Sequence, residues 1–269
     1  MEGSPLVSVI IPMYNSEIYI VDTINSVLAQ SYINFEILVI DDCSTDRSFD
    51  IVLDMTRNDS RIRLYKLSEN FGGPARPRNL GVSKSNGKYI AFLDSDDLWA
   101  ANKLEIQLNV MLNGKFNFTS TSQRNIDSSG KYISRNLFLG RIKGLFISRN
   151  SLPDLIIGKH IALSSVLVSK DALKFDFDES SQLIAVEDYF LWMNILNEQD
   201  VNYHFIDMEL LDYRVLAGSI SHRGKKYNHE AKSLFATLKF ILLSERYDLY
   251  PYVLKSIFFG LIVSLKNRL

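Results

Sequence analysis

This chain of 269 residues lacks cysteine pairs, a strong net charge and long apolar runs, and each absence excludes a class of protein. Cys43 is its one cysteine, so no disulfide can form within the chain, and a reducing compartment fits. The formal net charge of −1 gives no general attraction to nucleic acid. No run approaches the ~20 apolar residues of a membrane-spanning helix, and the apolar run at residues 6–11 lacks the basic start of a signal peptide. We therefore expect a cytoplasmic globular protein with no nucleic acid partner.

The glycine-rich signatures of phosphate binding are also absent. A dinucleotide-binding domain needs Gly-x-Gly-x-x-Gly after its first strand, but residues 12–17 here are Pro-Met-Tyr-Asn-Ser-Glu. No Gly-x-x-x-x-Gly-Lys-Ser/Thr loop occurs either. A bound diphosphate would then be held by a metal and by side chains. Arg76 and Arg78 are candidates because guanidinium matches phosphate geometry, with a solvated loop as the alternative.

The first hundred residues alternate between strand-like and helix-like patterns. Short apolar runs predict strands at 7–12, 35–40, 62–66 and 89–93. Apolar residues at helical spacing predict a helix over 17–30, a second helix capped by Ser44 or Thr45, and a short helix over 78–85. This order implies a mostly parallel sheet with helices on both faces. In such sheets ligands bind at the carboxyl ends of the strands.

The segment Asp94-Ser95-Asp96, directly after the 89–93 strand, is the most informative in the chain. Side chains alternate along extended backbone, so Asp94 and Asp96 are expected to point the same way and Ser95 the other way. Hard divalent cations such as Mg²⁺ and Mn²⁺ take oxygen ligands from one or two carboxylates and from substrate phosphates. The segment therefore predicts a metal–diphosphate site, with a solvated acidic turn as the alternative.

Several segments together resemble the family 2 nucleotide-sugar glycosyltransferases of GT-A fold, of the bacterial surface-polysaccharide type. They are residues 7–15, 26–30, 36–46, 78–81 and 87–99 in the first half, and 164–171, 177–180, 187–192 and 211–214 in the second. The resemblance spans residues 6–222 and implies a Rossmann-like GT-A domain over 1–225, with a nucleotide-binding half at 1–99 and an acceptor half at 100–225.

The chain departs from that family's patterns in two places. Residues 74–79 are Pro-Ala-Arg-Pro-Arg-Asn, where a small-small-Ala-Arg-Asn pattern is commoner. The Gln-x-x-Arg-Trp motif of processive synthases is absent: Trp99 and Trp192 are the two tryptophans, and neither follows an arginine. The second departure argues for transfer of a single sugar and against polymerisation.

The resemblance implies roles for individual residues in binding the donor. Pro12, Tyr14 and Asp42 would line the uracil end of a nucleoside diphosphate, with Tyr14 against the base and Asn15 also contacting the donor. Asp41, next to Asp42, would only shape the turn.

The remaining implied roles concern the metal and the reaction. Arg78 would contact the nucleotide, Asp94 would bridge the ribose and a Mn²⁺ or Mg²⁺ ion, and Asp96 would bind that ion. Asp188 would be the catalytic base.

Asp188 also has a physical argument. It precedes residues 189–197, whose spacing predicts a helix, so Glu187 and Asp188 could simply cap that helix. Sugar transfer with inversion, however, needs one base to deprotonate the acceptor hydroxyl, and no general acid if a metal neutralises the departing diphosphate. The helix N-terminus is expected to keep the Asp188 carboxylate ionised near neutral pH, with Glu187 as its orienting partner.

The last fifty residues hold two further expectations. Residues 219–226 are polar and basic, which fits either a linker or a loop that closes over the diphosphate, as in related enzymes, with His222 as a metal ligand and Arg223 as a positive charge. Residues 226–269 are helix-prone and form a C-terminal helical extension. Its apolar stripes fit helices packed on the domain, a dimer contact, or a peripheral contact with the inner face of the cell membrane.

Taken together, the sequence predicts a metal-dependent, inverting, non-processive glycosyltransferase. It would move one sugar from a nucleotide-sugar to a hydroxyl of a glycan or lipid-linked glycan, in the synthesis of a cell-surface polysaccharide. The expected donor is a UDP-sugar. The alternatives are a non-catalytic nucleotide-sugar binder, which the intact Asp42, Asp94, Asp96 and Asp188 disfavour, and a processive synthase, whose motif and membrane spans are missing.

Overall fold

The computed structural model describes residues 4–133, 150–158, 161–216 and 226–266. Its strands are β1 (Val7–Met13), β2 (Phe35–Asp41), β3 (Ile62–Lys66), β4 (Tyr89–Phe92), β5 (Leu98–Trp99), β6 (Phe118–Ile126), β7 (Tyr132–Ile133), β8 (Leu167–Ser169) and β9 (Tyr203–Arg214). Its α-helices are α1 (Ile20–Leu28), α2 (Ser48–Asn58), α3 (Ala75–Lys84), α4 (Lys103–Gly114), α6 (Leu152–Gly158), α7 (Glu187–Leu196), α8 (Lys226–Ser244) and α9 (Tyr250–Lys266).

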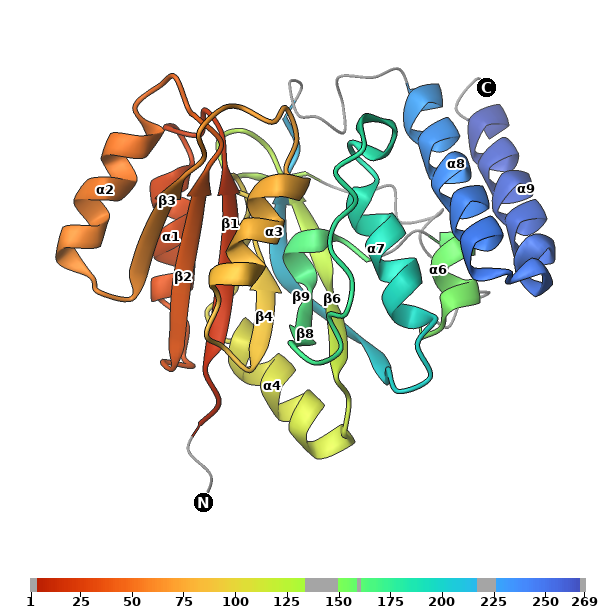
Figure 1. Cartoon of the computed structure of the whole chain (residues 1–269), viewed down its shortest axis with the longest axis horizontal. Helices are drawn as coiled ribbons and strands as arrows, with labels where there is room; N and C mark the ends of the chain where they lie inside the picture. The colour runs from red at the N-terminus through yellow and green to blue at the C-terminus, as the bar shows by residue number, and fades with distance from the viewer. Residues whose placement is uncertain (1–3, 134–149, 159–160, 217–225, 267–269) are drawn as a thin grey trace.

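The strands form one mixed sheet across the described part of the chain (Figure 1), in the order β3-β2-β1-β4-β8-β6-β9-β5, with β7 paired to β6. The first four strands of this order run parallel. Strand β8 joins them to the second half through antiparallel pairing with β4 and β6, and β6 and β9 again run parallel. The predicted α/β fold with a mixed, mostly parallel sheet is confirmed.

Helices cover both faces of the sheet, and the central strands show why. Along β1, Val9 and Ile11 belong to an apolar cluster shared with α1 and α4, whereas Ile10 between them belongs to a second cluster shared with α3, α6, α7 and α8. All three side chains are fully buried. A strand covered on both faces needs apolar residues at every position, which accounts for the continuous apolar runs in the sequence.

The predicted elements exist, but three helices in the first hundred residues begin at other residues than predicted. Helix α1 begins at Ile20 rather than at residue 17, and α3 begins at Ala75, three residues before the predicted start. Helix α2 begins at Ser48, so Ser44 and Thr45 do not cap it. The Asp46 carboxylate accepts the Ser48 N–H instead, at 2.9 Å.

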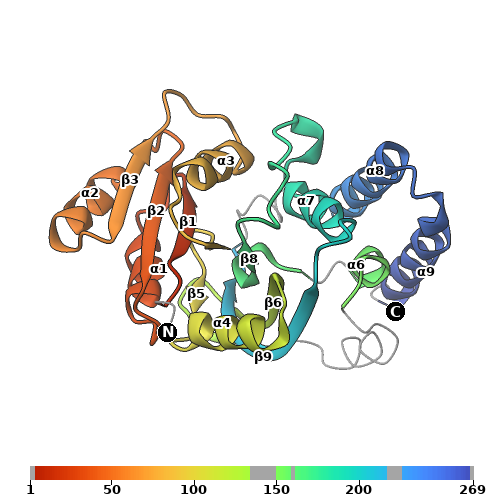
Figure 2. The ribbon, with the colours of Figure 1, turned by 60° about the horizontal axis from the view of Figure 1, so that its bottom comes forward.

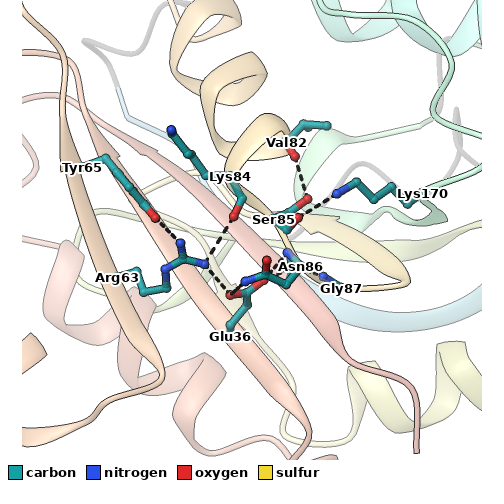
Figure 3. A network of polar contacts seen from close by, with 10 residues as sticks. Glu36, Arg63, Tyr65, Val82, Lys84, Ser85, Asn86, Gly87 and Lys170 are labelled. Carbon is teal, nitrogen blue, oxygen red and sulfur yellow. Dashed lines mark hydrogen bonds and ion pairs between the residues drawn. The ribbon is translucent and has the colours of Figure 1, made fainter.

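A polar network joins the amino ends of the first strands on the side away from the strands' carboxyl ends (Figure 3). The buried Glu36 carboxylate accepts hydrogen bonds from Ser8 Oγ (2.6 Å), the Asn86 N–H (2.6 Å) and an Arg63 guanidinium nitrogen (2.8 Å). Burial alone would raise the pKa of Glu36, but these hydrogen bonds outweigh it and hold the pKa below the ordinary value. Glu36 thus ties β1, β2, β3 and the turn before β4 together.

Over the residues whose burial is described, the C-terminal helices pack on the rest of the chain through one side. In Figures 1 and 2 they lie beside α7 and α6, at the opposite end of the molecule from α2. Phe240 and Ile241 of α8 and Val253 of α9 are buried in the same apolar cluster as α7. Leu243 and Leu254, in contrast, are 70% and 68% exposed. No helix in the described ranges is both long and apolar enough to cross a membrane.

Candidate active site

One cleft at the carboxyl ends of the parallel strands gathers the predicted site residues. Its volume is about 1100 Å³, which is ample for a nucleotide-sugar. The segments that follow β1, β2 and β4 form one side, and the start of α7 contributes to the other. The predicted donor, metal and base residues line it, apart from His222: Pro12, Tyr14, Asn15, Asp42, Arg78, Asp94, Asp96 and Asp188. Arg76, the other candidate for holding a diphosphate, lines a smaller hollow instead and pairs with Glu179 at 3.0 Å. His222 and Arg223 lie outside the described residues, so their roles stay predictions.

The wall formed by the turns after β1 and β2 is held together by Asn15. This residue adopts a left-handed conformation (φ 49°), which asparagine tolerates better than most side chains. Its Oδ1 accepts the Thr45 N–H at 2.8 Å, and its own N–H donates to Ser44 Oγ at 3.0 Å. Asn15 therefore shapes the cleft wall, and Tyr14 beside it is 48% exposed and free to meet a planar base.

Asp42 forms the floor of this part of the cleft. Its Oδ1 accepts the Phe71 N–H at 3.0 Å, and the side chain is buried. Burial raises the pKa of Asp42 above its ordinary value, although backbone hydrogen bonds from Phe71 and Gly72 oppose this. Asp41 is fully buried, and its carboxylate accepts the Ser44 N–H at 3.2 Å, which fits the predicted turn-shaping role.

The acidic segment after β4 is a turn rather than extended chain. Strand β4 ends at Phe92, and the Asp97 N–H donates to the Asp94 carbonyl at 3.1 Å. The predicted alternation, with Ser95 pointing away, was therefore wrong: Ser95 lines the cleft beside Asp94 and Asp96. Its Oγ lies 2.6 Å from Ser16 Oγ, and this bond holds the turn against the start of α1.

The surroundings of Asp96 disfavour its charged form. Burial and the neighbouring charge of Asp94 raise the pKa of Asp96 to about 6. Within the described residues no group of three or more His, Cys, Asp and Glu side chains could hold a metal ion. Two oxygen-bearing residues facing an open cleft still fit Mg²⁺ or Mn²⁺, since these ions usually keep water and substrate phosphate as further ligands.

Two residues that the sequence did not single out support this turn from behind. The fully buried Asp97 accepts the Ser164 hydroxyl at 2.6 Å and the Arg214 N–H at 2.8 Å. Burial raises the pKa of Asp97 well above the ordinary value. The Arg214 guanidinium donates to the Asp96 carbonyl at 2.8 Å and lies over the Tyr19 ring. A charged residue at the very end of a long strand was the signal that could have identified Arg214.

Arg78 connects the acidic turn to the opposite side of the cleft. It lies in the first turn of α3, which sits close to β1 because residue 81 is glycine: a Cβ there would be 2.4 Å from Ile10 Cγ2. One guanidinium nitrogen donates to Asp94 at 2.8 Å, and another donates to Glu187 at 2.6 Å. Arg78 is buried, so it acts first as a bridge between two walls.

Asp188 lies in the first turn of α7, but capping does not account for it. The N-cap residue of α7 is Val186, and among the described residues the Asp188 carboxylate accepts one hydrogen bond, from the N–H of the adjacent Tyr189 at 2.7 Å. Burial, followed by the charge of Glu187, raises the pKa of Asp188 to about 7. The expectation that the helix N-terminus keeps this group readily ionised was therefore wrong. Glu187 pairs with Arg78 instead of orienting Asp188.

The backbone before α7 is held by the C-terminal extension. Ala185 has φ 76°, a conformation that costs a non-glycine residue about 1 kcal/mol or more. Lys232 of α8 donates to the Ile184 carbonyl at 2.7 Å, and Lys239 pairs with Asp178 at 2.6 Å. Helix α8 thus fixes the loop that presents Glu187 and Asp188 to the cleft.

Comparison with known proteins finds relatives over most of the chain. A Rickettsia felis protein described as an uncharacterized glycosyltransferase is 39% identical over 214 residues, which cover 79% of this chain and 33% of that protein. The chain thus spans about a third of that relative. The Escherichia coli UDP-Glc:alpha-D-GlcNAc-diphosphoundecaprenol beta-1,3-glucosyltransferase WfgD is 34% identical over 216 residues, 80% of this chain and 79% of WfgD.

The fold and the family follow from two further matches. The structure of Staphylococcus aureus TarS 1–349 in complex with UDP-GlcNAc superposes with a TM-score of 0.68, at 22% identity, over 87% of this chain and 66% of that one. This chain therefore shares the GT-A fold with TarS. Residues 8–172, which include the acidic turn, match the family described as Glycosyl transferase family 2. Because this match takes in more than half of the chain, the protein belongs to glycosyl transferase family 2.

Proposed function

We propose that this protein is a metal-dependent, inverting glycosyltransferase that transfers one sugar from a UDP-sugar to a hydroxyl of a glycan acceptor. The observation that carries the proposal is the arrangement of the cleft. It brings the carboxylate pair Asp94 and Asp96 together with one separate carboxylate, Asp188, whose pKa of about 7 suits proton transfer near neutral pH.

The proposed reaction needs one proton transfer by the protein. Asp188 would accept the proton of the acceptor hydroxyl while that oxygen attacks the anomeric carbon from the face opposite the nucleotide. The bond from the anomeric carbon to the diphosphate oxygen would break, UDP would leave, and the configuration would invert. Asp94 and Asp96 would hold a Mn²⁺ or Mg²⁺ ion, which supplies positive charge to the diphosphate. Tyr14 and Asp42 would hold the base.

The donor and acceptor are proposed from the relatives. WfgD is named as a UDP-Glc-dependent enzyme with a diphosphoundecaprenol-linked acceptor, and TarS was solved with UDP-GlcNAc. We propose a UDP-sugar donor and a lipid-linked glycan acceptor, in bacterial cell-surface polysaccharide synthesis. Transfer of single sugars is supported by the absence of Gln-x-x-Arg-Trp.

A lipid-linked acceptor would place the protein at the inner face of the cell membrane. The outer sides of α8 and α9 support a peripheral contact there, because Leu242, Leu243, Leu254 and Phe258 are all more than 60% exposed. Lys255 lies on the same helix as two of them, and a basic residue near an anionic surface contributes about 1 kcal/mol.

The test is nucleotide release from a panel of UDP-, GDP- and dTDP-sugars with a lipid-linked acceptor extract, in Mn²⁺ or Mg²⁺ and in EDTA. We expect release from a UDP-sugar that depends on both acceptor and metal. Tight UDP binding without release from any donor would favour the non-catalytic nucleotide-sugar binder.

A further inference from the structure

The ion pair between Arg78 and Glu187 is incomplete. Glu187 is 3% exposed, and its Oε1 accepts one hydrogen bond from Arg78 at 2.6 Å. Its Oε2 is buried and has no hydrogen-bond partner among the described residues, and the same holds for Arg78 Nε. Buried carboxylate oxygens in folded proteins are nearly always hydrogen-bonded. The pair therefore offers one free acceptor and one free donor, which suits a hydroxyl because a hydroxyl can donate and accept at once.

The place of Glu187 in the site restricts what binds it. Glu187 lines both the main cleft and a small adjoining hollow of about 60 Å³, formed with Gly73, Pro74, Ser180 and Ile184. A water-sized group needs roughly 10–15 Å³ on this measure. The hollow thus has room for a hydroxyl or hydroxymethyl substituent of a sugar ring. It is too small for a nucleoside.

Charge and sequence position identify the ligand group. A carboxylate repels phosphate, so the diphosphate is excluded from Glu187 Oε2. Glu187 lines the same cleft as Asp188, the proposed base, while another nitrogen of the Arg78 guanidinium bonds Asp94 in the acidic turn. With the metal and diphosphate at the acidic turn, as proposed above, the Glu187 end of this pair would be on the side of the reacting sugar.

We propose that Glu187 Oε2 accepts a hydrogen bond from a hydroxyl of the sugar being transferred, and that the adjoining hollow receives the ring substituent beside that hydroxyl. This inference rests on the proposed nucleotide-sugar function. It makes Glu187 a residue that selects the donor sugar, distinct in role from Asp188, which acts on the acceptor.

The test compares binding of donors that differ in one hydroxyl, in the absence of acceptor. Calorimetry would give Kd values for UDP, UDP-glucose and UDP-GlcNAc, and for the 3-, 4- and 6-deoxyfluoro analogues of the tighter-binding sugar, since fluorine cannot donate a hydrogen bond. The proteins would be the wild type, Glu187→Gln, and a control, Glu198→Gln, beyond the far end of α7. We expect one analogue to bind the wild type and the control about 10- to 100-fold more weakly than its parent, and Glu187→Gln to bind both alike.

The ratio of parent to analogue affinity isolates the hydrogen bond from any general effect of removing a charge. If this ratio is the same in the wild type and in Glu187→Gln at every ring position, the inference is overturned. The proposed function still stands in that case, provided that the wild type binds UDP. A wild type that does not bind UDP would overturn both. If Glu187→Gln melts too low to measure, Ser180→Val, which fills the hollow, should weaken the parent sugar nucleotide about tenfold relative to UDP; an unchanged ratio would refute the inference.

Discussion

Replacing Asp188 by asparagine should abolish most activity and yet make the protein more stable at alkaline pH. Asparagine keeps the shape of the side chain but cannot accept the proton of the acceptor hydroxyl. General base catalysis contributes typically ~10²–10⁴-fold to a rate, and we expect a loss of nucleotide release in that range. UDP affinity should stay within about twofold of the wild type, because Asp188 lies outside the wall that holds the base.

The gain in stability follows from the raised pKa. The ordinary value is 3.8 and the folded value is about 7, a difference of about 3 units, which at ~1.36 kcal/mol per unit sets an upper limit of about 4 kcal/mol. The folded state holds the proton more tightly than the unfolded state, so Asp188 destabilises the fold increasingly as pH rises from 3.8, and fully above 7. Part of the carboxylate faces the cleft, so we expect a measured gain of about 1–2 kcal/mol for Asp188→Asn at pH 8.

The measurement is thermal unfolding of the metal-free protein at pH 4 and pH 8, beside the release assay. A chain of this size gains roughly 2–4 °C in Tm per kcal/mol, so the variant should melt several degrees higher at pH 8 and within about a degree of the wild type at pH 4. Asp171→Asn, at an exposed position, is the control and should change neither property. A variant that is less stable at pH 8, or that keeps its turnover, would refute the assignment of Asp188 as a buried base.

Three further predictions concern the metal, the fold and the tail. Asp96→Ala should lower activity about 100-fold, or ~3 kcal/mol, and EDTA should do the same to the wild type; activity indifferent to both would remove the metal from the mechanism. Glu36→Gln should destabilise the protein by about 1–3 kcal/mol at pH 7. Because the pKa of Glu36 is lowered, that difference should vanish as pH falls well below 4.5, and an equal loss at pH 3 would contradict it. A chain ending at Tyr250 should melt lower, since it loses the buried Val253, and should no longer sediment with anionic vesicles at low salt; unchanged sedimentation would argue against membrane contact through α9.

The sequence by itself determined the fold class and most of the cleft. The continuous apolar run at residues 89–93 is typical of a strand covered on both faces, and the order of strands and helices places the ends of such strands at one edge. Asp42, Asp94 and Asp96 follow those strands directly, so their convergence on one cleft was predictable from their position alone.

Only the tertiary structure decided how the charged groups interact. Arg78, Asp94 and Glu187 are far apart in the chain, and no local pattern shows that one guanidinium joins both carboxylates. The pKa of Asp188 depends on burial and on the charges of Glu187, Arg78 and Asp94, two of which come from the first half of the chain. Local sequence sets the backbone conformation within a few residues. Desolvation and ion pairing of a side chain depend instead on which distant segments surround it and exclude water, and those segments come together only when the chain folds.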